Sequence, residues 1–214
     1  MENLEHFLQR LKTTAWRTSC ARFNAARRLK RRDGFATFSI AFFSALSVGV
    51  SIIPRIYALP TGSMVENHIS TLSIFIGIFV IIISLIEWAA NSQGAGEKLY
   101  ENAKKLNAFS RKLDQFIATN TSNIQFNKDD VTFFREEYES IIASCPLNHL
   151  PIDDLLFLVA HRKSEEFLSH DKKPRIGLIK SWYILLKGLL ADTWFYAILW
   201  LTVSVILLMI FTAH

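Results

Sequence analysis

The sequence predicts an all-α membrane protein organised around an antiparallel pair of transmembrane helices. Two apolar runs support this prediction: residues 35–53 contain no charged residue, and residues 69–90 contain only Glu87. A helix of about 20 apolar residues crosses the roughly 30 Å hydrocarbon core of a bilayer. Because backbone within lipid must satisfy its own hydrogen bonds, each run should be helical. We therefore expect a hairpin over residues 34–90, with spans at about 35–57 and 69–90.

The distribution of basic residues predicts the orientation of this hairpin. Nine of the 24 Lys and Arg residues lie in residues 1–32 and thirteen lie in residues 91–180, whereas the joint between the spans holds only Arg55. Lys and Arg are retained on the cytoplasmic side of a membrane. We therefore expect the N-terminus and the central region in the cytoplasm. The joint should lie outside, beginning at Pro54, which interrupts helices.

The sequence on either side of the hairpin has helical periodicity. The pattern of residues 1–33 predicts a basic amphipathic helix. A second periodic stretch, roughly 97–118, follows a weak helix interruption at 91–96. The first helix could lie on the bilayer or pack against a partner helix, and packing is favoured. We expect the two stretches to form cytoplasmic stalks that bury their apolar stripes against each other. On the first stalk we expect five arginines at the surface: Arg10, Arg17, Arg27, Arg28 and Arg31.

The remainder of the cytoplasmic region, residues 91–180, is also predicted to be helical. A polar loop at 119–127 precedes a helix that Asp129 or Asp130 should cap. Another helix should start at Pro151 and end before a charged break at 169–175.

Residues 181–214 are predicted to return to the membrane as an interfacial helix and a third span. The run from Thr193 to Ala213 is uncharged and 21 residues long, which at helical rise covers about 31 Å. Trp182 and Tyr183 precede it, and aromatic residues favour the membrane interface. The span should run outward and leave His214 in the periplasm; the alternative is an unusually buried helix.

Small and hydroxyl-bearing residues recur along the first two spans. The candidate packing or pore-facing positions are Ala41, Ser44, Ala45, Ser47, Gly49, Ser51, Ser73, Gly77 and Ser84. Small residues let helix backbones approach closely, and hydroxyls can form hydrogen bonds between helices. Two interpretations stay open: these faces pack the hairpin together, or they face other protomers and line a wet path after assembly.

Glu87 is the only ionisable residue within the two apolar runs. A carboxylate within a membrane is a functional candidate because it is costly to place there. Glu87 lies about one turn from the cytoplasmic edge, where it could reach headgroups or pair with Arg31 or Arg32. An anchoring role and a role in gating therefore both stay open.

No catalytic or metal-binding motif stands out. The six histidines are scattered, and no HExxH, GxxxxGK[ST] or GxGxxG pattern occurs. The net charge of +5 could indicate nucleic-acid binding. Basic residues beside membrane spans are better explained by anionic headgroups. We expect a protein that is not an enzyme, needs no cofactor and contacts membrane lipids rather than nucleic acid.

One segment of the central region resembles a known family. Tyr138-Glu-Ser-Ile-Ile142, followed by Asn148-His149 and Asp153, is similar to the Y-x-x-[IL]-L … N-H-x-x-x-D segment of SLATT-type two-transmembrane effectors of bacterial conflict systems. The order of basic helix, hairpin and helical cytoplasmic region also matches. Pro146-Leu147 stands where that family has an acidic residue. The C-terminal span resembles the subgroup found alongside reverse transcriptases.

This resemblance implies an effector of antiphage defence in the bacterial inner membrane. Such an effector would rest inactive, then oligomerise and permeabilise the membrane in abortive infection when a sensor signals. A reverse transcriptase or a nucleotide-signal module would be that sensor. Tyr138, Asn148, His149 and Asp153 would belong to a cytoplasmic sensing or structural region. From the residues alone, Asn148 and His149 form a polar turn and Asp153 caps a helix. A membrane-anchored scaffold and a constitutive channel are the alternatives.

Overall fold

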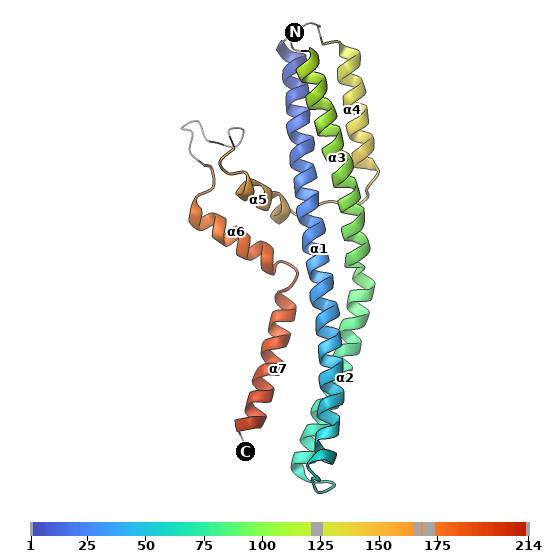
Figure 1. Cartoon of the computed structure of the whole chain (residues 1–214), viewed down its shortest axis with the longest axis vertical. Coiled ribbons are helices and arrows are strands. Elements are labelled where there is room, and N and C mark those ends of the chain that lie inside the picture. The colour runs from blue at the N-terminus through green and yellow to red at the C-terminus, as the bar shows by residue number, and fades with distance from the viewer. Residues whose placement is uncertain (1, 121–125, 165–167, 169–173, 213–214) are drawn as a thin grey trace. The chain divides into compact units, whose positions relative to one another are not determined.

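The structure, a computed structural model, describes residues 2–120, 126–164, 168 and 174–212 (Figure 1). Parts of the expected loop at 119–127 and charged break at 169–175 lie outside these residues, as does His214. The described residues form helices and no strand, apart from an isolated bridge between Leu168 and Pro174. This confirms the all-α prediction. The helices are α1 (Glu2–Ile56), α2 (Met64–Ala90), α3 (Ser92–Asn120), α4 (Lys128–Ala143), α5 (Pro151–Ala160), α6 (Leu178–Leu190) and α7 (Trp194–Thr212).

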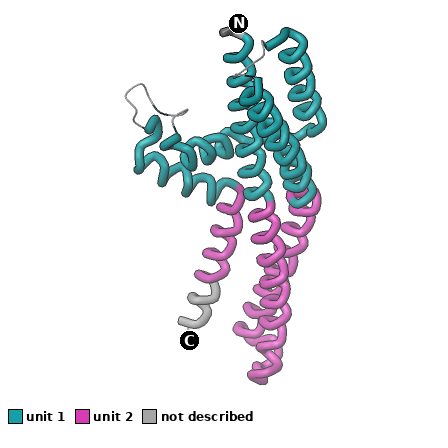
Figure 2. Tube along the Cα trace, turned by 45° about the horizontal axis from the view of Figure 1, so that its top comes forward, with its two compact units in different colours: residues 1–29, 93–191 teal, residues 30–92, 192–214 magenta. Residues whose placement is uncertain are grey.

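The chain divides into two compact units (Figure 2). Unit 1 comprises residues 1–29 and 93–191, and unit 2 comprises residues 30–92 and 192–214. The helix α1 contributes its first half to unit 1 and its second half to unit 2. No turn separates the basic stretch from the first apolar run, as expected from the lack of Pro or Gly before Gly34.

In unit 1 the N-terminal half of α1 lies beside α3, and α4 lies along α3 (Figure 1). Their shared core is built from Leu8, Leu11 and Ala15 of α1, Phe109, Leu113 and Ile117 of α3, and Phe134 of α4. The two predicted stalks therefore bury their apolar stripes against each other, as expected. Burial of these side chains supplies the main force that holds the three helices together.

The helix α4 begins differently from the prediction. Asn127, not Asp129 or Asp130, precedes the first helical turn, and its backbone N–H donates to the Asp130 carboxylate at 3.0 Å. Asp130 therefore satisfies a free N–H from inside the first turn, where a negative charge also suits the helix dipole.

The helix α5 is attached to α1 by a buried ion pair within unit 1. Asp153 is fully buried and accepts hydrogen bonds from Arg28 Nε at 3.0 Å and Arg28 Nη2 at 3.1 Å. Arg28 is itself buried, so its expected place on the surface is wrong. Asp153 is also not the N-cap: it is the third helical residue and accepts the Leu150 N–H at 2.9 Å.

In unit 2 the second half of α1 and α2 form an antiparallel hairpin (Figure 1). Pro54 was expected to begin the joint, but α1 continues to Ile56. A proline in the last turn removes one hydrogen bond, but the bond from Tyr57 N–H to the Ile53 carbonyl, at 3.1 Å, still forms beyond it.

The connection that follows is a tight turn with a defined start for α2. Gly62 has φ +78°, a left-handed conformation that glycine adopts without strain. Ser63 then caps α2 by accepting the Glu66 N–H at 3.2 Å, and Glu66 accepts the Gly62 N–H at 2.7 Å. This reciprocal capping starts the helix at Met64, earlier than the expected span at 69–90.

The helix interruption expected at 91–96 is reduced to one residue. Asn91 has φ 44° and ends α2, and both Gly94 and Gly96 lie within α3. Asparagine tolerates this left-handed conformation better than most residues. The break therefore depends on Asn91 and not on the glycines.

Two helices among the described residues are long and apolar enough to cross a membrane, by length and composition. They correspond to the two halves of the predicted hairpin, and a third span results if α6 and α7 are counted together as one interrupted span. The third span, with its outward direction, stays a prediction.

The Arg28–Asp153 pair generates a stability prediction. Asp153→Asn should lower the free energy of unfolding of unit 1 by about 3–5 kcal/mol, because it removes the buried negative charge that pairs with the buried Arg28 guanidinium. The matched control is Glu101→Gln in the pair with Lys104, whose side chains are 61% and 54% exposed and which should cost less than about 1 kcal/mol. Urea unfolding of the full chain in detergent measures both, and equal losses would contradict the prediction.

Candidate functional site

Unit 2 contains a polar clamp formed by Arg32, Glu87 and Tyr196. Glu87 of α2 accepts a hydrogen bond from Arg32 Nη2 of α1 at 2.9 Å and one from the Tyr196 hydroxyl of α7 at 2.5 Å. Both donors bond the same carboxylate oxygen, Oε1, and the Glu87 side chain is only 13% exposed. One carboxylate thus connects three helices.

The clamp provides the Glu87 carboxylate, near the C-terminal end of α2, with a cation and hydrogen-bond donors. An unpaired carboxylate within hydrocarbon costs about 3 kcal/mol or more, so Glu87 needs a cation and hydrogen-bond donors. Of the partners considered from the sequence, the structure shows Arg32. It also adds Tyr196, an aromatic residue near the start of the predicted third span. A tyrosine near the start of an apolar run was the available signal, but nothing in the sequence tied it to Glu87.

Two serines join the helices of the hairpin further along. Ser47 Oγ donates to the Ser73 carbonyl and Ser73 Oγ donates to the Ser47 carbonyl, each at 2.9 Å. Gly77 lies beside this pair: a Cβ atom built on it would be 3.6 Å from Ser47 Oγ. For Ser47, Ser73 and Gly77, the structure shows contacts within the hairpin.

The other candidate positions in the spans make no such contact between helices. Three serines donate to carbonyls of their own helix, Ser44 to Ile40, Ser51 to Val48 and Ser84 to Val80, each at 2.7 Å. Ala41, Ala45 and Gly49 lie exposed on α1, and a Cβ atom built on Gly49 would meet open space. The small-residue stripe Ala41–Ala45–Gly49 is therefore exposed and unused among the described residues.

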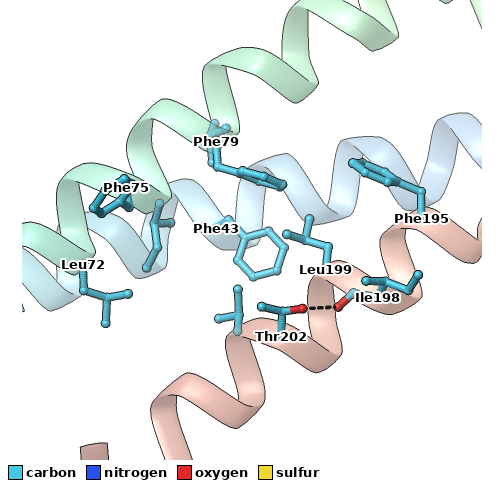
Figure 3. Close-up of a pocket in the computed structure, with 11 residues that line it drawn as sticks. Phe43, Leu72, Phe75, Phe79, Phe195, Ile198, Leu199 and Thr202 are labelled. Carbon is cyan, nitrogen blue, oxygen red and sulfur yellow. Dashed lines mark hydrogen bonds between the residues drawn. The ribbon is translucent and has the colours of Figure 1, made fainter.

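An apolar groove of about 350 Å³ lies between α1, α2 and α7 in unit 2 (Figure 3). Phe43, Phe79 and Leu199 point into it from the three helices. Nearby, Trp200 of α7 packs on Phe42 with ring centroids 4.5 Å apart, and its indole N–H donates to Ser39 Oγ at 3.0 Å. The helix α7 is thus held to the hairpin by aromatic packing and two hydrogen-bonded side chains.

The four candidate residues of the cytoplasmic region divide between two places in unit 1. Tyr138 packs beside Phe109, with ring centroids 5.9 Å apart, in the stalk core. Asn148 and His149 lie in the irregular connection between α4 and α5, where Asn148 Oδ1 accepts the His149 N–H at 2.9 Å. Asp153 follows three residues after Leu150, at the start of α5.

A polar pocket of about 340 Å³ lies next to this connection. Its lining residues are Thr13, Thr14, Arg17, Thr18, His149 and Asp154. Arg17 holds Asp154 through two hydrogen bonds, at 2.7 and 2.6 Å, and this pairing raises the pKa of the guanidinium. Burial lowers the pKa of His149, which favours the neutral imidazole at pH 7.

Sequence reasoning did not single out a second buried arginine in unit 1. Arg22 hydrogen bonds to Asn102 Oδ1, and its Nε atom has no hydrogen-bond partner among the described residues. Burial lowers the pKa of Arg22. Asn102 in turn donates to the Ile141 carbonyl at 2.6 Å, so this arginine belongs to the contact between α1, α3 and α4. Among the described residues, no group of three or more His, Cys, Asp or Glu side chains could hold a metal ion.

The polar clamp generates a prediction about the attachment of α7. Tyr196→Phe removes one hydrogen bond to a charged acceptor and should destabilise the packing of α7 by about 1.5–3 kcal/mol. Glu87→Gln should cost more, because it also leaves Arg32 without its partner. Thermal unfolding in detergent, followed by Trp200 fluorescence in a variant without the other tryptophans, measures both. The matched control is Tyr183→Phe, an exposed tyrosine of unit 1; a loss as large as that of Tyr196→Phe would contradict the assignment.

Comparison with known protein families assigns the chain to one of them. The sequence matches the SMODS and SLOG-associating 2TM effector domain family 5 over residues 4–210, nearly the whole chain. The comparisons with curated proteins and with solved structures find no match. The match agrees with the resemblance seen in the 138–153 segment and with the two membrane-length helices, and it describes a family of membrane effectors of conflict systems, not a known enzyme family. The chain therefore belongs to the SMODS and SLOG-associating two-transmembrane effector domain family 5.

Proposed function

We propose that this protein is an antiphage effector of the bacterial inner membrane that associates with copies of itself and permeabilises the membrane after an upstream sensor acts. The observation that carries the proposal is the unused small-residue stripe Ala41–Ala45–Gly49 on the membrane hairpin. Small residues at four-residue spacing are the positions at which helices pack closely in lipid. In the described part of the chain these positions are exposed, which makes the face available to a second copy.

The polar clamp supports a resting state that can change. An effector that is harmless before infection needs two arrangements of similar free energy, one of which the trigger favours. The Glu87 carboxylate holds α7 against the hairpin through Tyr196. Any other helix that packed on this part of the hairpin would have to displace α7. We propose that activation opens this contact and that the freed apolar faces then assemble.

A permanently open channel receives less support from the same residues. Ser44, Ser51 and Ser84 satisfy carbonyls of their own helix, and Glu87 is engaged by Arg32 and Tyr196. Over its described residues the hairpin therefore offers no continuous row of free polar groups. A conducting path would have to form between copies.

The small-residue stripe generates a test of assembly. Ala45→Leu places a large side chain on the exposed stripe, so it should prevent close packing between copies and abolish depolarisation of infected cells, with the hairpin intact. Ala89→Leu makes the same change on an exposed part of α2 outside the stripe and should leave depolarisation unchanged. Gly77→Leu should instead disturb the hairpin itself, because it meets Ser47.

Membrane-potential dyes and the mass of the detergent-solubilised complex measure the outcome in cells carrying the complete defence locus. Depolarisation by Ala45→Leu at the wild-type level would overturn the proposal. A potential that stays intact during full activation of the wild-type system would overturn it as well. Protection that persists after the spans are replaced by an unrelated anchor would favour a scaffold instead.

A further inference from the structure

The helix α6 in unit 1 has two faces of opposite character. Ser181, Ile184 and Gly188, spaced three and four residues apart, are buried against α5. The contact is close: a Cβ atom built on Gly188 would lie 2.9 Å from the methyl carbons of Leu156. The packing face therefore uses small residues and fixes α6 to α5.

The outward face of α6 is apolar and exposed. Ile179 is 89% exposed and Trp182 is 73% exposed. The other exposed large apolar side chains of this helix are Leu178, Tyr183, Leu185, Leu186, Leu189 and Leu190. A contiguous apolar surface of this kind marks an interaction site.

The charge on α6 has one sign. Lys180 and Lys187 are seven residues apart and therefore lie on one side of the helix, next to Tyr183 at the edge of the apolar face. Both are exposed. Residues 174–191 add Arg175 and contain no acidic residue. An apolar arc that contains Trp and Tyr and is flanked by lysines is the pattern of a helix lying in a membrane interface.

We propose that α6 binds an anionic lipid surface, with its apolar arc at the boundary of headgroups and acyl chains and its two lysines on lipid phosphates. Only residues 191–193 separate it from the apolar helix α7, and three residues span at most about 10 Å. The inference rests on α7 being the predicted third span, because a helix tethered so closely to a span reaches the surface of the bilayer. Symmetric pairing with a second α6 would instead bring like charges together, since this segment offers no acidic side chain.

Binding of α6 to lipid would also act on α1 within unit 1. The helix α5, on which α6 rests, holds Arg28 through Asp153 and Arg17 through Asp154. Trp16 of α1 packs on Phe157 of α5, with ring centroids 5.1 Å apart. The helices α5 and α6 together would therefore connect a lipid surface to the N-terminal half of α1. This inference is independent of whether the effector permeabilises the membrane.

The test places an environment-sensitive NBD label at Ile179→Cys in the full chain, in a background with Cys20→Ser and Cys145→Ala. The protein is reconstituted into vesicles of phosphatidylcholine, alone or with one quarter phosphatidylglycerol. Quenching by a nitroxide high on the lipid acyl chain is compared with quenching by aqueous iodide. The matched control is Phe133→Cys on α4, an apolar residue that is 55% exposed. A second labelled variant, Leu186→Cys, guards against a local effect of one label.

The proposal expects lipid quenching and iodide protection at Ile179 and Leu186, stronger with phosphatidylglycerol, and iodide quenching at Phe133. Lys180→Gln combined with Lys187→Gln should lower the ratio of lipid-bound to free α6 about 30-fold in the anionic vesicles. Iodide quenching at both α6 labels would overturn the proposal. So would protection from both quenchers, which would mean that protein covers the helix, or equal behaviour in both lipids with no effect of the lysines.

Discussion

The arrangement of unit 2 depends on one buried carboxylate that must remain paired. Glu87 is the only ionisable residue in the apolar run 69–90 of α2, where an isolated charge is costly and a fully bonded one is tolerated. Arg32 supplies the charge and Tyr196 a further donor, so the requirement of a single side chain draws three helices together. The pairing explains how a helix far along the chain becomes part of the hairpin unit, and why this contact is a natural place for a change of state.

In unit 1 a second buried acidic residue, Asp153, must also remain paired. Arg28 and Asp153 are buried together, and Asp153 also satisfies the N–H of Leu150 at the start of α5. The ion pair fixes the position of α5 on α1, and α5 in turn carries α6. An apolar core holds the long helices side by side, whereas paired charges determine where the short helices attach.

Much of this fold could be predicted because the deciding signals are local. Apolar runs of membrane length and three- and four-residue periodicity predict the hairpin and the stalks. The errors arose where a distant residue decides the outcome. Arg28 looks like a surface cation in its helix, and only Asp153, 125 residues away, makes its burial possible. Tyr196 is 109 residues from Glu87, and no local pattern joins them. For Pro54, the local rule failed because its position in the last helical turn makes the lost hydrogen bond cheap.

The most direct test of the central claim measures the distance between α2 and α7 in the resting protein. Spin labels on the exposed residues Ile82 and Leu201 report this distance by double electron–electron resonance in lipid nanodiscs. The account predicts a single narrow distance distribution for the otherwise wild-type chain and a broad, longer one when Glu87 is replaced by Gln. A narrow and identical distribution in both proteins would show that the carboxylate does not hold α7, and would contradict the account.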